Sequence, residues 1–262
     1  MGIVNVTPDS FSDGGVHFDA EVAVRSALAM VEAGADILDV GGESTRPGAA
    51  PLSMDDEIAR VAPVIEGIVR RANVAVSIDT YKAGVAERAL DLGALIINDI
   101  SALAYDPALA DVAARRGAPV ILMHNRGRSA KMYEFAEYGD VVADIARELT
   151  ARADAAVAAG VARNRIVLDP GFGFAKRAEH SLHALARLAE FHALGFPLLS
   201  GPSRKSFLQT GLGERAPSAR IWGTAAAVTA SVLAGAHIVR VHDVAQMVDV
   251  VRVADAIAAA PA

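Results

Sequence analysis

Two carboxylates stand directly after apolar runs: Asp79 in the segment Ser-Ile-Asp-Thr (77–80) and Asp169 in Leu-Asp-Pro-Gly (168–171). An unpaired carboxylate in a partly desolvated site is costly, so each needs a partner. That partner can be internal, for which Lys205 is a candidate, or it can be a ligand with parallel N–H groups, such as an aminopyrimidine edge. Asn98, after another apolar run, can donate and accept beside them. These residues predict a site for a nitrogen heterocycle.

A second group of residues favours an anion. Arg46, Arg240 and His242 bring guanidinium and imidazole groups to the ends of the runs 36–41 and 237–242, which we expect to be neighbours. Such a cluster is typical of a phosphate-binding site. Asn5 and Asp13 offer an amide oxygen and a carboxylate to Mg²⁺, which takes few protein ligands besides phosphate oxygens and water. A lone residue of this kind equally suits a structural hydrogen bond, so the prediction rests on the convergence of all five.

The elements that must position these side chains are eight short apolar runs, each typical of a parallel strand buried on both faces. They span residues 1–6, 36–41, 74–79, 95–99, 119–124, 165–169, 196–201 and 237–242. Almost every run stops at a polar residue: Asn5, Asp39, Asp79, Asn98 with Asp99, His124, Asp169, Ser203, and Arg240 with His242. In a (β/α)8 barrel the active site forms where the strands end. We therefore predict an α/β fold, a single (β/α)8 TIM-barrel domain over residues 1–262.

Alanine-rich segments with helical spacing lie between the runs, for example 20–33, 55–71, 140–159 and 223–233. Several of them end at a glycine just before the next run, which predicts helix stops at residues 34, 93, 117, 160, 195 and 235. Three connections are long and polar, at 7–15, 42–51 and 202–206. Long loops at the catalytic rim of a barrel are more often lids than spacers.

Composition narrows the class of protein. The chain has 262 residues, close to the roughly 250 that are typical of a (β/α)8 barrel. It has no cysteine, which excludes disulfides and thiolate metal sites and suits the reducing cytosol, so we expect a cytoplasmic protein. A net charge of −6 without a basic stripe argues against nucleic-acid binding. The apolar runs are too short to span a membrane, and the opening segment looks like a strand, not a secretory signal.

Seven stretches of the chain together resemble the dihydropteroate synthase family of pterin-binding barrels. They are NVTPDSFSDGG (5–15), GGESTRPGA (41–49), SIDT (77–80), IND (97–99), LDPGFGF (168–174), SRKS (203–206) and RVHD (240–243). They follow the family's order and spacing over essentially the whole chain. One motif is moderately specific and the set is very specific, since STRPG and SRKS in one barrel distinguish this family from other pterin-binding barrels.

The resemblance implies the condensation of 6-hydroxymethyl-7,8-dihydropterin diphosphate with 4-aminobenzoate in folate biosynthesis, with sulfonamides as competitors. The pterin would be held by Asp79, Asn98, Met123, Asp169 and Lys205, with Asp79, Asp169 and Lys205 catalytic. The diphosphate would be held by Asn5, Arg46, Arg240 and His242, with Mg²⁺ at Asn5 and Asp13. Thr45, Pro47, Phe174, Lys205 and Ser206 would frame the aminobenzoate. The expected partners are these small molecules and a second copy of the chain in a homodimer.

The chain departs from the family pattern in places. Met-His-Asn-Arg-Gly (123–127) stands where members commonly have a second apolar residue after Met-His, which changes the polarity of the loop 125–136. The chain also opens directly at its first strand, where members usually have a short segment that covers the barrel bottom. Trp222, the only tryptophan, precedes a helix of small residues that suits a core or a dimer surface equally.

Two other functions remain open from sequence. A methyltetrahydrofolate-binding methyltransferase barrel would share the pterin pocket, but it needs neither a diphosphate site nor the STRPG loop. A catalytically silent pterin-binding module is the other alternative. Arg46, Lys205, Arg240 and His242 argue against a silent module, because a mere binder has no leaving group to hold.

Overall fold

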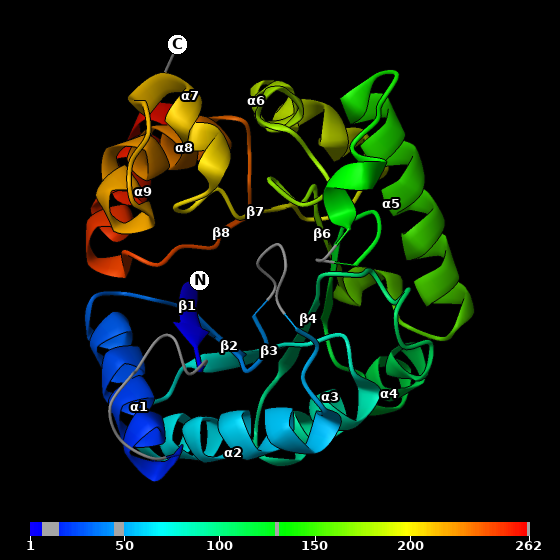
Figure 1. Cartoon of the computed structure of the whole chain (residues 1–262), viewed down its shortest axis with the longest axis vertical. Coiled ribbons are helices and arrows are strands. Elements are labelled where there is room, and N and C mark those ends of the chain that lie inside the picture. The colour runs from blue at the N-terminus through cyan, green and yellow to red at the C-terminus, as the bar shows by residue number, and fades with distance from the viewer. Residues whose placement is uncertain (7–15, 45–49, 129–130, 261–262) are drawn as a thin grey trace.

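Parallel strands alternate with helices along the chain. The computed structural model describes residues 1–6, 16–44, 50–128 and 131–260, and Figure 1 shows the helices surrounding the strands. The strands are β1 (Gly2–Asn5), β2 (Ile37–Gly41), β3 (Ala75–Asp79), β4 (Ile96–Asp99), β5 (Val120–Met123), β6 (Ile166–Asp169), β7 (Leu199–Ser200) and β8 (Ile238–Val239). The first six begin and end within one residue of the predicted runs, whereas β7 and β8 are shorter than predicted.

The longer helices confirm the predicted helical segments. They are α1 (Val16–Glu32), α2 (Met54–Arg71), α3 (Ala83–Asp91), α4 (Ala108–Arg116), α5 (Val141–Ala158), α6 (Ala178–Ala186), α8 (Ile221–Leu233) and α9 (Val244–Ala258). Shorter elements are α7 (Gln209–Leu212) and the 3₁₀ helices η2 (Met132–Phe135), η3 (Arg163–Arg165), η4 (Leu188–Leu194), η5 (Ser206–Leu208) and η6 (Pro217–Arg220). No helix in the described part of the chain is long and apolar enough to cross a membrane.

The strands form a ring in chain order. Strands β1 to β6 make one parallel sheet, and β7 pairs with β8. Single parallel bridges, from Leu168 to Leu198 and from Gly2 to Val241, join the two sheets at both edges. This arrangement confirms the predicted (β/α)8 barrel. One expectation was wrong: β2 and β8 are not neighbours, because β1 pairs with β2 on one side and bridges to the end of β8 on the other.

The register of the sheet brings the strand ends to one level. Asp79 at the end of β3 is the register partner of Asn98 on β4, and Met123 at the end of β5 is the partner of Asp169 on β6. Asn5 likewise pairs with Gly41 where β1 and β2 end. The carboxyl ends of parallel strands meet at the same edge, so this rim is where the polar residues gather.

Local sequence signals fix where the helices begin and end. The Ser53 hydroxyl accepts the Asp56 N–H at the start of α2, and the Asp140 carboxylate accepts two N–H groups at the start of α5. Helix α2 also carries acidic residues in its first turn and two arginines in its last, which complements the helix dipole. All six glycines predicted as stops have positive φ, and Gly117 ends α4 in the left-handed region.

Candidate active site

A cavity opens at the carboxyl ends of the strands, and we call it the rim cavity. It is lined by Asp79, Asn98, Ile100, Met123, Asp169, Gly171, Phe172, Phe174, Gly201, Lys205 and Arg240. The five residues that the resemblance implied for a pterin are all among them. They come from β3, β4, β5, β6 and the loop after β7, so the barrel assembles them from segments far apart in the sequence.

Arg240 spans the barrel mouth between two carboxylates. Its Nε donates to Asp39 at 2.6 Å, and its Nη2 donates to Asp79 at 2.6 Å. The Asn98 amide donates to the same Asp39 oxygen at 2.9 Å. The sequence placed Arg240 with the anion-binding group, but it lies among the carboxylates. It is also the internal partner of Asp79, a role for which the sequence had suggested Lys205. No described carboxylate forms an ion pair with Lys205.

Asp39 is a residue of this cluster that the sequence placed at a strand end without giving it a role in the site. It is fully buried and accepts from both Arg240 and Asn98. A signal was available, because Asp39 is a charged residue inside an otherwise apolar run, and a buried carboxylate requires strong partners. Asp99, by contrast, accepts the backbone N–H groups of Ser101 and Leu103 and so shapes the loop after β4.

Burial perturbs the charges around the rim cavity. It raises the pKa of Asp79 to about 7, and the Arg240 guanidinium opposes that rise. It also raises the pKa of Asp169, whose Oδ1 accepts the Gly171 N–H at 2.7 Å. Burial, followed by the repulsion of Arg240, lowers the pKa of the Lys205 ammonium to about 8. A ligand that donates hydrogen bonds to these carboxylates would favour their charged forms.

Lys205 and His242 lie in the loops that follow β7 and β8, and Lys205 lines the rim cavity. The Lys205 ammonium lies 3.9 Å from the centre of the Phe174 ring, a cation–π contact, and exposed Ser206 follows it at the start of η5. The Ser203 hydroxyl accepts the backbone N–H of His242 and lies 3.0 Å from its Nδ1. The Ser203 proton is thus free to bond to Nδ1, which leaves the His242 Nε2–H as a donor.

The remaining predicted site residues divide into two groups. Asn5 is half-buried at the end of β1. Asp13, Thr45, Arg46 and Pro47 lie outside the described residues. Of the three long loops predicted, 7–15 lies wholly outside them, 42–51 in part (residues 45–49), and 202–206 within them. No group of three or more His, Asp or Glu side chains that could hold a metal ion gathers within residues 1–6, 16–44, 50–128 and 131–260.

Comparison with known proteins identifies relatives over nearly the full length. Residues 1–242 match the family described as pterin binding enzyme. The dihydropteroate synthase of Escherichia coli is 48% identical over 256 residues, which cover 98% of this chain and 90% of that protein. The dihydropteroate synthase of Xanthomonas albilineans with 4-aminobenzoic acid superimposes with a TM-score of 0.93 at 44% identity, covering 100% of this chain and 93% of that one.

A third relative is the Yersinia pestis dihydropteroate synthase, solved as a complex with a sulfonamide drug. It superimposes with a TM-score of 0.93 at 44% identity, covering 99% of this chain and 94% of that chain.

Gly171 supplies a first prediction, because its backbone touches the loop after β5. Its φ is +70°, and a Cβ placed there would lie 2.1 Å from the His124 carbonyl oxygen. Gly171→Ala should therefore lower the free energy of unfolding by about 3 kcal/mol or more, since left-handed strain of roughly 1–2 kcal/mol adds to a backbone clash. The measurement is urea unfolding followed by circular dichroism.

The matched control for this prediction is Gly117→Ala. Gly117 also has positive φ, at +60°, but a Cβ there meets nothing within 4 Å, so only the strain remains. Equal losses of stability in the two variants would show that the contact between Gly171 and His124 is not tight.

The buried histidines generate a second prediction. Burial lowers the pKa of His242 to about 3, so the imidazole stays neutral in the folded protein, whereas in the unfolded chain it takes up a proton below pH 6.5. Because the folded pKa is depressed, this stability is complete above pH 6.5 and is lost as the pH falls towards 3. The expected loss from this one histidine is about 2 kcal/mol between pH 7.5 and pH 5.

The measurement compares urea unfolding of the wild type and of His242→Asn across this pH range. The comparison isolates His242, because Asp79 and Asp169 have raised pKa values and contribute a pH dependence of opposite sign in both proteins. The stability of the wild type relative to the variant should decline as the pH falls. A constant difference would contradict the prediction.

Proposed function

The chain belongs to the pterin-binding enzyme family, and from that membership we propose which of its residues carry the reaction. The activity is that of a dihydropteroate synthase, a transferase of folate biosynthesis. It condenses 6-hydroxymethyl-7,8-dihydropterin diphosphate with 4-aminobenzoate and releases 7,8-dihydropteroate and diphosphate. The observation that best supports the assignment of residues is the rim cavity, whose lining includes every side chain proposed for the pterin.

Asp79, Asn98 and Asp169 recognise the N–H edge of the pterin. Carboxylates accept parallel hydrogen bonds from an aminopyrimidine, and no described residue donates to the Oδ2 atom of Asp169. The bond from the Asn98 amide to Asp39 fixes the direction in which the Asn98 oxygen points. Met123, which is buried and lines the same cavity, adds apolar contact to the ring.

The charges in the cavity favour a reaction through a cation. Two carboxylates that line the cavity, Asp79 and Asp169, and the buried Asp39 that binds Arg240 are set against two cations, Arg240 and Lys205. The mouth therefore retains negative charge when all five are ionised. The bond between the pterin methylene and diphosphate breaks, and its electron pair leaves with the diphosphate. The carboxylates stabilise the delocalised cation, an effect worth roughly 3–4 kcal/mol for each preorganised group. The amine of 4-aminobenzoate then attacks the methylene and loses its proton to solvent.

The diphosphate is held by Asn5, Arg46, Arg240 and His242. Arg240 uses Nε and Nη2 for Asp39 and Asp79, and no described residue accepts from its Nη1, which can serve the anion. The neutral His242 contributes a hydrogen bond from Nε2 and no charge. Asn5 and Asp13 would hold Mg²⁺, and an amide and a carboxylate oxygen suit an ion that also binds phosphate and water. When bound, Mg²⁺ supplies positive charge that neutralises the diphosphate.

Thr45, Pro47, Phe174, Lys205 and Ser206 frame the 4-aminobenzoate. The described part of this group supports the proposal, because Lys205 and Phe174 both line the cavity, the Lys205 ammonium lies over the Phe174 ring, and Ser206, which is exposed, follows Lys205 at the start of η5. An ammonium held over one face of an aromatic ring can attract the substrate carboxylate, and the rest of the ring remains for contact with the aniline.

A cytoplasmic homodimer completes the proposal. Trp222 on α8 is 75% exposed, and Leu233, which is 49% exposed, lies three helical turns further along the same helix face. Exposed large apolar side chains that share a helix face favour contact with another protein surface.

The catalytic assignment is tested by Asp169→Asn. The amide keeps the Oδ1 acceptor for the Gly171 N–H but removes the charge, so the variant should fold and lose about a hundredfold or more in kcat. The measurement is dihydropteroate formation with saturating pterin diphosphate, 4-aminobenzoate and magnesium. Asp91→Asn, the same change at a surface carboxylate paired with Arg116, serves as the control and should retain full activity. Near-normal turnover of Asp169→Asn would remove this residue from the mechanism.

Sulfonamides should compete with 4-aminobenzoate. A sulfonamide copies the aniline ring, and its additional substituent projects towards the loop that carries Pro47, where no residue is inserted into STRPGAAP to exclude it. The relative from Yersinia pestis was solved with such a drug. The test is a steady-state series with 4-aminobenzoate varied at fixed drug concentrations and saturating pterin diphosphate. The expected pattern raises KM and leaves kcat unchanged, whereas undiminished activity at a large drug excess would show that the pocket excludes sulfonamides.

A further inference from the structure

Lys176 is a buried lysine that the reaction as described so far does not use. It follows the Asp-Pro-Gly-Phe-Gly-Phe motif after β6 and is only 2% exposed. Its Nζ lies 2.8 Å from His124 Nδ1, 3.0 Å from the Gly171 carbonyl oxygen and 3.0 Å from the Phe174 carbonyl oxygen. A fourth acceptor, the His124 carbonyl oxygen, lies at 3.3 Å. The ammonium therefore joins the loop after β5 to the loop after β6.

The acceptors suit an ammonium that acts as a tether. An ammonium has three N–H donors and no acceptor, and its partners here are a ring nitrogen and carbonyl oxygens. Within the described residues no carboxylate pairs with Lys176, and burial lowers its pKa to about 7. Desolvating an ammonium is costly, so these bonds are what retain it between the loops.

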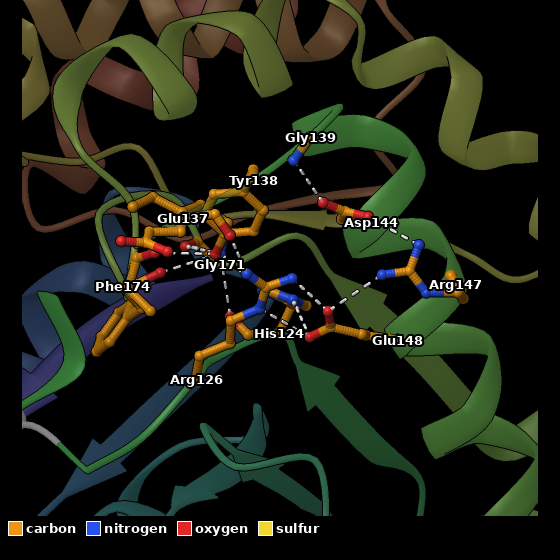
Figure 2. A network of polar contacts seen from close by, with 12 residues as sticks. His124, Arg126, Glu137, Tyr138, Gly139, Asp144, Arg147, Glu148, Gly171 and Phe174 are labelled. Atoms are coloured by element: carbon orange, nitrogen blue, oxygen red, sulfur yellow. Dashed lines mark hydrogen bonds and ion pairs between the residues drawn. The ribbon is translucent and has the colours of Figure 1, made fainter. Parts of the chain in front are cut away.

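The far side of His124 continues the network (Figure 2). His124 Nε2 lies 3.0 Å from a Glu148 oxygen, and burial lowers the pKa of His124 to about 4, so the ring is neutral. A neutral ring that donates from Nε2 to Glu148 presents the lone pair of Nδ1 to Lys176. Glu148 also accepts from Arg126, which departs from the family pattern in this loop. The Arg126 guanidinium lies 4.1 Å from the centre of the Tyr138 ring.

Tyr138 makes a second tie between the loops. Its hydroxyl donates to the Ala175 carbonyl oxygen at 2.9 Å, one residue before Lys176. The turn that both ties hold is strained at Ala175, a non-glycine residue with a φ of +48°, whereas Gly171 and Gly173 adopt their positive φ without strain. A backbone of this kind persists only when its surroundings fix it.

This turn carries the proposed catalytic carboxylate. The carbonyl of Gly171 accepts from Lys176, while the N–H of the same glycine donates to Asp169 Oδ1 at 2.7 Å. Phe174, whose carbonyl also accepts from Lys176, lies under Lys205 at the rim cavity. We propose that Lys176 is a positioning residue: it fixes Gly171 against the loop after β5 and thereby orients the Asp169 carboxylate and the Phe174 ring towards the pterin. The inference rests on the role proposed above for Asp169.

The test is Lys176→Met, which keeps the length of the side chain and removes its donors. We expect kcat to fall at least thirtyfold and the affinity for 6-hydroxymethylpterin, measured by calorimetry, to fall at least tenfold. The affinity for magnesium diphosphate alone should change less than twofold, because its proposed ligands lie on other loops. Lys131→Met, the same change at an exposed lysine, should leave all three values unchanged. Normal turnover and pterin affinity in a folded Lys176→Met protein would overturn the proposal.

A double-mutant cycle separates positioning from general support of the fold. If Lys176 acts through Asp169, then adding Lys176→Met to Asp169→Asn should cost much less than the thirtyfold it costs alone. Multiplicative losses would assign Lys176 a purely structural role and overturn the proposal. If Asp169→Asn is fully active while Lys176→Met is impaired, the catalytic assignment of Asp169 fails, and with it this inference. If Asp169→Asn is impaired and Lys176→Met is not, only this inference fails.

A measurement on the unaltered protein decides the case if Lys176→Met does not fold. Nitrogen NMR of protein labelled at histidine should show His124 as the neutral tautomer, with its proton on Nε2 and Nδ1 accepting a hydrogen bond, at pH 7. A proton on Nδ1 of His124 would remove the acceptor for Lys176, and the proposed tether would be wrong.

Discussion

The bridge from Arg240 to Asp39 and Asp79 is the interaction on which the rest of the structure depends. It places a guanidinium between two carboxylates at a desolvated rim, where unpaired charges are not tolerated. It also leaves Asp169 outside the bridge, with only one of its oxygens satisfied by Gly171. The mouth of the barrel thus combines a guanidinium that offsets only one of its two carboxylate charges with a further carboxylate, Asp169, that has one unsatisfied oxygen. A substrate that becomes a cation during its reaction suits this arrangement, because its positive charge develops next to carboxylates that are already in place.

The βα-loops contribute by holding these groups at fixed positions. The turn after β6 includes Ala175 at a φ of +48°, a strained conformation for a non-glycine residue that persists only when the surrounding structure fixes it. Side chains from outside the cavity, Lys176 and Tyr138, bind its carbonyl groups. Buried neutral His124 completes the contact with the loop after β5. Preorganisation of the site therefore depends on residues that never reach the substrate.

Much of the fold could be predicted because each strand is a short apolar run with a polar end. Strands β1 to β6 match the predicted runs within one residue, and the predicted pterin residues line one cavity. The contacts that could not be predicted join residues that are far apart in the sequence and meet across the barrel. Arg240 meets Asp39 from 201 positions away, and Lys176 meets His124 from 52 positions away, so no local pattern encodes either contact. The wrong neighbour assigned to β8 has the same origin, because strand adjacency is a property of the closed ring.

The two-residue strands β7 and β8 have a consequence for how the barrel opens. They join the six-stranded sheet through single bridges, whereas neighbouring strands within that sheet share continuous ladders of three to five residue pairs. Arg240 follows β8, and its two carboxylates lie on β2 and β3, so its ion pairs fasten this quarter of the ring to the opposite sheet. Local opening should therefore begin at β7 and β8. The ion pairs of Arg240, which arrange the site for catalysis, also hold the barrel closed at this point.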